Sequence, residues 1–329
     1  MKLQNLLLFV FFIFVIHSCK EKEETTTELN EIKKDEEHKE GVQPFAEHIF
    51  SRFTNVRDFT MNTEQNEAYF SLQSPARELS VIMKIEKKND VWQEPQISSF
   101  SGRYTDLEPF LSPDNLKLYF VSNRPISADS TNIKDMDIWY VERETKMAKW
   151  SEPKNIGAPI NTIADEFYPA VASNKNLYYT TIKKELESAD DIFMSKWENN
   201  RYSEPKLLGE GVNTKGAEFN AFIAPDESYI IFGGWQRTDG IGAGDLYISR
   251  NINGEWATAE NLGEKINSKQ TDFCPFVNNN ILYFTSRRSS VELKEGGFSS
   301  AEELFSEINK YDNGTSRIYQ IDFNTFLNQ

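Results

Sequence analysis

The sequence predicts an all-β fold, a single β-propeller with five blades, with six blades as the runner-up. A short aromatic strand recurs every 50 to 59 residues, around Phe70, Phe120, Tyr179, Phe232 and Phe284. Strand-and-turn repeats of this length form blades around an axis. Turns such as Ser112-Pro113-Asp114 join adjacent strands, since Pro and Asp favour tight connections. Hydrophobic residues make up 39% of the chain, which is enough for a packed core.

The N-terminus predicts a lipoprotein signal peptide over residues 1–18. Leu6 to Ile16 are eleven consecutive apolar residues behind Met1-Lys2, too short to span a bilayer and typical of a secretory signal. The following Val15 to Cys19 resembles the lipobox of bacterial lipoproteins. We therefore expect lipidation at Cys19, a disordered charged tether over 19–43, and the propeller over 44–329. The expected location is the cell outer membrane, lipid-anchored and either periplasmic or surface-facing.

The best-formed repeat starts with an alternating strand, Asp137 to Val141, as expected for a half-buried strand. Trp150-Ser151-Glu152-Pro153 follows, then Asn155-Ile156-Gly157. Matching copies of this alternating strand begin at Asp191 and Asp245. The sequence therefore predicts four strands in each blade.

Ring closure is predicted from what the last repeat lacks. Its third strand, 318–323, has no Trp-Ser-Glu-Pro strand after it, whereas residues 44–53 lie where that strand belongs. We expect this N-terminal segment to complete the last blade, because an open ring would leave unpaired blade faces. An insertion, 289–316, is predicted in the same blade, with a short amphipathic helix near 300–308.

These motifs resemble the PD40, or WD40-like, repeats related to the propeller of TolB. The motifs are Ser112 to Asp114, Leu118 to Arg124, Asp137 to Trp139 and Trp150 to Pro153. The resemblance covers about residues 59–323. It implies a β-propeller and says almost nothing about activity.

Four carboxylates occupy one repeat position, before each inner strand: Asp106, Glu166, Glu218 and Asp272. Three interpretations remain open. They could be catalytic carboxylates of a glycosidase, a site for a channel cation such as calcium, or acceptors for backbone N–H groups within the blades. We expect no other metal or cofactor. His17, His38 and His48 all lie outside the repeats, which argues against Ser-His-Asp catalysis and His-rich metal sites.

Residues without repeat equivalents are candidates for partner binding. These are Trp235 and Arg237, with Phe298 and Phe305 of the insertion. The net charge of −15 argues against a nucleic-acid partner. The expected partner is an envelope protein or a glycan. With Cys19 lipidated, Cys274 has no disulfide partner, and we expect it to be buried.

The predicted function is that of a non-catalytic, lipid-anchored propeller that acts as a protein-binding or scaffolding module of the cell envelope. The alternative is a carbohydrate-active enzyme of the glycoside hydrolase type that uses channel-mouth carboxylates. A weaker alternative is a cation-dependent peptide-binding protein of the TolB kind.

Overall fold

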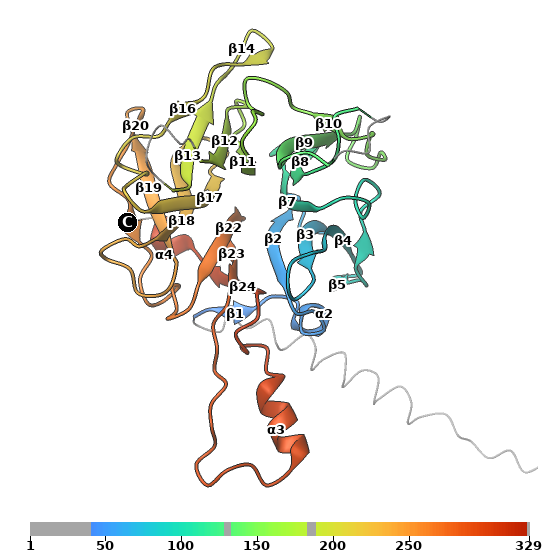
Figure 1. Ribbon diagram of the computed structural model, residues 1–329, viewed down its shortest axis with the longest axis vertical. Helices are drawn as coiled ribbons and strands as arrows, with labels where there is room; N and C mark the ends of the chain where they lie inside the picture. The colour runs from blue at the N-terminus through green and yellow to red at the C-terminus, as the bar shows by residue number, and fades with distance from the viewer. Residues whose placement is uncertain (1–40, 128–132, 183–188, 328–329) are drawn as a thin grey trace, which may run out of the picture. The chain divides into compact units, whose positions relative to one another are not determined.

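The computed structural model describes residues 41–127, 133–182 and 189–327. The predicted signal peptide, Cys19 and all but the end of the tether lie outside the described residues. Five antiparallel sheets of at least four strands surround an axis, as Figure 1 shows. The predicted five-bladed propeller is confirmed. Within the described ranges, no helix is long and apolar enough to cross a membrane.

Each blade runs outward from its first strand, and the last blade takes its outermost strand from the N-terminus. Blade 1 contains β2 (Val56–Met61), β3 (Glu67–Gln73), β4 (Ser80–Lys88) and β6 (Gln96–Ile97). Blade 2 contains β7 (Asp106–Leu111), β8 (Lys117–Ser122), β9 (Asp137–Glu142) and β10 (Lys154–Asn155). Blade 3 contains β11 (Glu166–Val171), β12 (Leu177–Thr181), β13 (Asp191–Ser195) and β16 (Lys206–Leu207). Blade 4 contains β17 (Ala217–Ile223), β18 (Tyr229–Trp235), β19 (Asp245–Ile252) and β21 (Glu260–Asn261). Blade 5 contains β22 (Asp272–Asn278), β23 (Ile281–Ser286), β24 (Arg317–Asp322) and β1 (Gln43–Pro44).

Smaller elements extend the blades. The short strands are β5 (Val91–Trp92), β14 (Trp197–Glu198), β15 (Arg201–Tyr202) and β20 (Glu255–Trp256). The helices are α2 (Glu47–Phe50), α3 (Ala301–Ile308) and α4 (Asn324–Leu327).

The ring closes through an N-terminal strand, as predicted, but the strand is shorter than the predicted segment 44–53, because Glu47–Phe50 form α2. In β1, Gln43 lies opposite Gln320 and Pro44 opposite Tyr319 of β24. The backbone N–H of Phe45 then donates to the carbonyl of Ile318 at 3.0 Å. Blade 5 is therefore built from both ends of the propeller sequence.

Aromatic packing holds this closing strand in place. The Phe45 ring centroid lies 4.9 Å from that of Phe59 and 5.2 Å from that of Tyr283. Trp92 and Phe50 complete the cluster, with centroids at 5.9 and 6.0 Å. Because Phe59 and Trp92 belong to blade 1 and Tyr283 to blade 5, Phe45 joins the first blade to the last.

Each inner strand has a bulge at the same point, where one residue takes a positive φ. The five residues are Asp58, Glu108, Tyr168, Asn220 and Cys274, with φ between 49° and 58°. The strand register shifts at every one of these sites. The left-handed conformation costs a residue other than glycine about 1–2 kcal/mol. The fold nevertheless keeps this conformation at the same position of all five blades. A bulge changes the direction of a side chain, and these five side chains form the inner ring described below.

We expect Phe45→Ala to destabilise the propeller by about 3–5 kcal/mol, because it removes a buried ring from the closing contact. Urea denaturation of the purified protein measures this loss. The exposed neighbour His48 provides the control, and His48→Ala should change stability by less than about 0.5 kcal/mol. Equal effects of the two substitutions would contradict the role given to Phe45.

Candidate functional site

The four predicted carboxylates are fully buried, each at the first position or near the start of an inner strand. In blade 4, the backbone N–H and the hydroxyl of Thr214 donate to Glu218 at 2.9 and 2.7 Å. The Nη1 of Arg237 adds an ion pair at 3.0 Å. In blade 5, Asp272 accepts the equivalent bonds from Ser268 and pairs with Arg288 at 3.0 Å.

The other two members of the set have related partners. Asp106 accepts from the hydroxyl of Ser101 at 2.8 Å and pairs with Arg124 at 2.6 Å. Glu166 accepts from the N–H and the hydroxyl of Thr162 at 3.1 and 2.6 Å. All four carboxylates therefore fasten the loop that enters a blade, and this arrangement favours the structural interpretation.

The structure corrects the assignment of Arg237. It was predicted to have no repeat equivalent, but it occupies the same place as Arg124 and Arg288, two residues after the end of the second strand. Its side chain is only 9% exposed and its guanidinium lies 4.4 Å from the ring centroid of Tyr247. Arg237 is therefore bound within its own blade. Trp235, at the end of β18, is 47% exposed and stays available.

The five bulge residues form an inner ring that was not predicted from the sequence. The thiol of Cys274 donates to Asp58 Oδ1 at 2.8 Å and lies 3.5 Å from Asn220 Oδ1. The N–H of Tyr168 donates to Glu108 Oε2 at 2.7 Å. These contacts join blade 5 to blades 1 and 4, and blade 3 to blade 2. Side chains from all five blades therefore meet at the axis.

Arg57 bridges the two acidic members of the inner ring. Its Nε donates to Asp58 Oδ1 at 2.7 Å, and its Nη2 donates to Glu108 Oε1 at 3.1 Å. Burial raises the pKa of Glu108; Arg57 opposes this rise, and the charges of Asp58 and Asp190 add to it. Asp58 Oδ2 is buried without a hydrogen-bond partner among the described residues. The inner ring is thus polar, and the positive charge between Asp58 and Glu108 is that of the Arg57 side chain.

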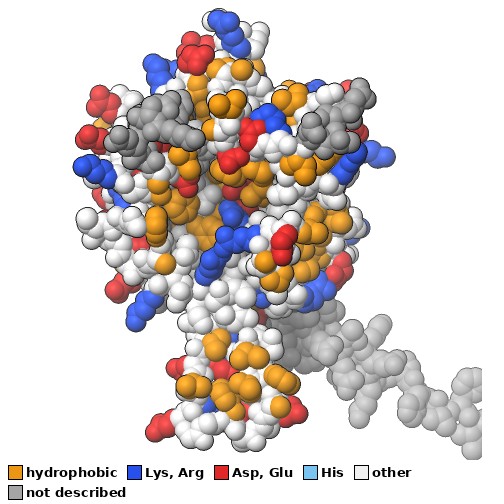
Figure 2. Space-filling model, in the orientation of Figure 1, with side chains coloured by type: hydrophobic (Ala, Val, Ile, Leu, Met, Phe, Trp, Pro, Cys, Tyr) orange, Lys and Arg blue, Asp and Glu red, His pale blue; other side chains and the backbone are white. Residues whose placement is uncertain are grey.

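More arginines surround this end of the axis. The guanidinium groups of Arg57 and Arg287 lie 5.3 and 5.8 Å from the ring centroid of Phe273. Burial lowers the pKa of Arg287, and the positive charges of Arg77 and Arg57 lower it further. Figure 2 shows Lys and Arg side chains near the middle of the face in view. An arginine-rich mouth repels cations.

The expected channel cation has little support in the part of the chain that the structure describes. There, no group of three or more His, Cys, Asp or Glu side chains is arranged to hold a metal ion. Between Asp58 and Glu108, the position that a calcium ion would need is taken by the Arg57 guanidinium.

The blade 5 insertion forms a projecting arm, residues 287–316, which Figure 1 shows extending from the disc. Ser300 caps α3 by accepting from the N–H of Glu303 at 3.2 Å. No residue of α3 is buried. Four apolar side chains of the arm are 38% to 90% exposed: Leu293, Leu304, Phe305 and Ile308. Phe298 is half-buried. Figure 2 shows apolar side chains grouped on the face of the arm that is in view.

Comparison with known proteins shows the fold. No family model and no curated protein sequence matches the chain. The structure of BT0996 in a complex with RGII has a TM-score of 0.55 at 8% identity, covering 90% of this chain and 94% of that protein. A glycoside hydrolase gives 0.53 at 7% identity with the same coverage. A TolB-like protein from Agrobacterium tumefaciens gives 0.45 at 12% identity, covering 70% and 69%.

One sequence signal could have revealed the inner ring. Each bulge residue lies two positions after the site of the repeated carboxylates, and in three blades a proline follows it: Glu108-Pro109, Tyr168-Pro169 and Cys274-Pro275. The bulge residues share no chemistry, however, so a search for repeated residue types passes over them.

We expect Glu218→Gln to destabilise the protein by about 3 kcal/mol or more, because it leaves the buried Arg237 guanidinium without a counter-charge. Urea denaturation measures the change. Glu255 is exposed, so Glu255→Gln should be nearly neutral. A loss below about 1 kcal/mol for Glu218→Gln would show that this ion pair is not structural.

Glu166 should make stability depend on pH. Burial raises its pKa to about 7, although hydrogen bonds from Thr162 lower it, whereas an unfolded Glu has a pKa of about 4.3. The folded state therefore binds the proton more tightly, so this stabilisation is complete below the unfolded value and is lost as the pH rises towards 7.

Glu166→Gln cannot titrate, so the variant should gain stability relative to the wild type between about pH 5 and about pH 8. Its amide can still bond to Thr162. The measurement is urea denaturation at several pH values, with Glu255→Gln as the control. A stability difference that stays constant over this range would refute the assignment.

Proposed function

We propose that this protein is a non-catalytic, lipid-anchored β-propeller that binds a partner protein of the cell envelope through its arm. Cys19 would carry the lipid, which would place the propeller at the outer membrane, facing the periplasm or the cell surface. The exposed apolar side of the arm is the observation that carries this proposal. Contiguous exposed apolar side chains on a soluble domain are typical of interaction sites.

The charges of the arm favour a protein over a lipid surface. Arg287 and Arg288 lie at its base, and beyond them the arm carries the acidic side chains Glu292, Glu295, Glu302, Glu303, Glu307 and Asp312 against Lys294 and Lys310. An anionic membrane attracts basic segments and repels acidic ones. A protein with an apolar groove and a basic rim suits this helix, because amphipathic helices bind in such grooves through side chains spaced three and four apart.

The contacts of the repeated carboxylates support a non-catalytic role. A general acid or a nucleophile needs a free oxygen near the substrate. Glu218 and Asp272 each accept three bonds within their own blades. These bonds support a structural role for the two carboxylates within their blades.

A carbohydrate-active enzyme is the second candidate, and the inner ring is the observation that favours it. Asp58 and Glu108 come from neighbouring blades and share Arg57. A buried carboxyl with a raised pKa suits a general acid, and glycosidases use two carboxyl groups. If this candidate were correct, Glu108→Gln would abolish a measurable glycosidase activity, whereas the binding role predicts no turnover by the wild type.

We expect Leu304→Asp/Phe305→Asp to abolish capture of the partner from detergent-solubilised envelope. Both substitutions place charge in the apolar contact, where burying an unpaired carboxylate is strongly unfavourable. Capture by the full chain with an intact Cys19, followed by mass spectrometry, measures the effect.

The control is Ile163→Asp, because Ile163 is 98% exposed and lies in the loop before β11. This variant should capture the same protein as the wild type. The proposal fails if the arm variant retains the partner, or if both variants lose it equally.

A further inference from the structure

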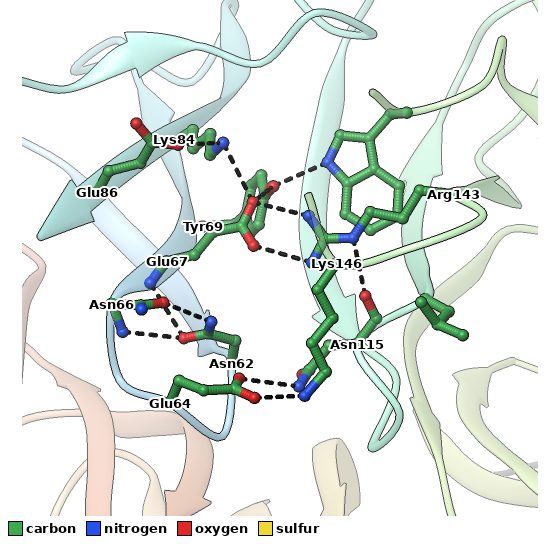
Figure 3. Close-up of polar contacts among 12 residues, drawn as sticks. Asn62, Glu64, Asn66, Glu67, Tyr69, Lys84, Glu86, Asn115, Arg143 and Lys146 are labelled. Atoms are coloured by element: carbon green, nitrogen blue, oxygen red, sulfur yellow. Dashed lines mark hydrogen bonds and ion pairs between the residues drawn. The ribbon is translucent and has the colours of Figure 1, made fainter. Parts of the chain in front are cut away.

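Adjacent blades meet at five related clefts, on the face that carries the turns between first and second strands. The cleft between blades 1 and 2 is closed by charge. Arg143 donates to both carboxylate oxygens of Glu67, at 2.9 and 3.1 Å. Tyr69 donates to Glu67 at 2.6 Å and accepts from Trp150 Nε1 at 2.8 Å. Figure 3 shows Arg143 facing Glu67 and Tyr69 across this cleft.

Three other clefts are closed by different means. Between blades 3 and 4, Glu227 accepts bonds from Tyr178 and Asn176, both at 2.8 Å. Between blades 4 and 5, Arg250 donates to the carbonyl of Phe326 in α4 at 2.7 Å. Between blades 5 and 1, the ring of Phe45 fills the space. Each of these four clefts is thus closed by a different contact.

The cleft between blades 2 and 3 is crossed by a hydrogen bond between Tyr119 and Tyr202, but it has no ion pair like that of Glu67 and Arg143, and it forms a cavity of about 1060 Å³. The strand register explains why. Lys117 begins β8 as Glu67 begins β3, and Trp197 follows β13 where Arg143 follows β9. The ion pair that closes the neighbouring cleft is thus replaced by a lysine and a tryptophan. A lysine and an indole cannot form that bidentate pair.

Aromatic rings line this cavity. The Trp197 and Tyr202 ring centroids lie 4.9 Å apart in an edge-on arrangement, and both rings are half-buried. Lys117 Nζ lies 4.3 Å from the centroid of Tyr140, on the opposite wall. Lys175 Nζ lies 5.8 Å from the centroid of Trp197. Two lysine side chains cover these rings, and Lys117 also pairs with Glu142 at 3.7 Å, so a ligand would displace these two ammonium groups to reach the aromatic surface.

The charged groups of the cavity include both cations and carboxylates. The cations are Lys117, Lys149, Lys175, Arg201 and Arg143, the last of which is already paired with Glu67, and the carboxylates are Asp114, Glu142 and Glu144. Ser112, Ser151 and Ser173 add hydroxyl groups. The carboxylates would repel an acidic polymer, and the cations would repel a basic one. A neutral polyhydroxylated chain uses both kinds of group and presents apolar ring faces to aromatic side chains.

We propose that the open cleft between blades 2 and 3 binds a neutral oligosaccharide. Sugar rings would pack against Trp197 and Tyr140, and their hydroxyl groups would bond to the surrounding lysines and carboxylates. The volume lies at the upper end of small-ligand pockets, about 300–1,000 Å³. This site is separate from the arm, so it does not depend on the partner protein proposed above.

The test is titration calorimetry of the purified protein with neutral hexasaccharides of glucose, xylose and mannose. We expect one of these probes to bind, and Trp197→Ala to weaken its affinity by about tenfold or more. Trp235→Ala is the control, since it removes an exposed tryptophan of blade 4 that lies outside the cavity. Circular dichroism confirms that each variant is folded.

A second variant is designed to close the cleft with an ion pair. Lys117→Glu/Trp197→Arg introduces the ion pair that Glu67 and Arg143 form between blades 1 and 2. It should abolish sugar binding and leave the melting temperature unchanged or higher. The proposal is overturned if no neutral hexasaccharide binds at millimolar concentration, or if these variants bind as well as the wild type. It is also overturned if an acidic oligosaccharide or a peptide occupies the cleft instead.

Discussion

Closure of the ring is the constraint on which the rest of this structure depends. Blades pack only against their neighbours, so one open junction would expose two faces and release the inner ring from its position at the axis. Here the junction combines the two-residue strand β1 and the ring of Phe45 with direct hydrogen bonds between the two blades, such as that from the N–H of Val56 to the carbonyl of Ser316 at 3.0 Å. The contacts of Cys274 with Asp58 link blade 5 to blade 1 at the axis, where they exist only because the junction is closed.

The residues that recur from blade to blade differ from those that we propose to bind partners or ligands. Residue types that recur in several blades, such as the entering carboxylates and their Ser or Thr partners, hold loops to strands. The surfaces with unused binding capacity arise where one blade departs from the others. Arg57 stands where other blades have Leu107 or Phe273, and Lys117 stands where blade 1 has Glu67. Repeated residue types therefore belong to the scaffold, and departures from the repeat mark the surfaces that we propose as binding sites.

The sequence was sufficient to predict the blades and their closure, because alternation, turn residues and period are local signals. It placed Asp106 and its equivalents just before the inner strands, whereas the structure has them at the first or second position of those strands. It could not predict the positive φ of Asp58 or Cys274, since a bulge is set by pairing with the next strand. Nor could it predict the open cleft, because that cavity depends on which side chains face each other across two blades, as Lys117 and Trp197 do. Arg237 was misassigned for the same reason, since its pairing with Glu218 spans two strands.

The position of β1 also has a mechanical consequence. Any tension on the chain ahead of Gly41 reaches the domain through the outermost strand of blade 5, at the seam of the ring. Few hydrogen bonds hold that strand, so the load falls on the wedge of aromatic rings around Phe45. Force applied from the opposite terminus meets α4 and the carbonyl of Phe326, which is held by Arg250. The two ends of the propeller are thus secured in different ways, one by edge-on aromatic packing and the other by a charge-assisted hydrogen bond.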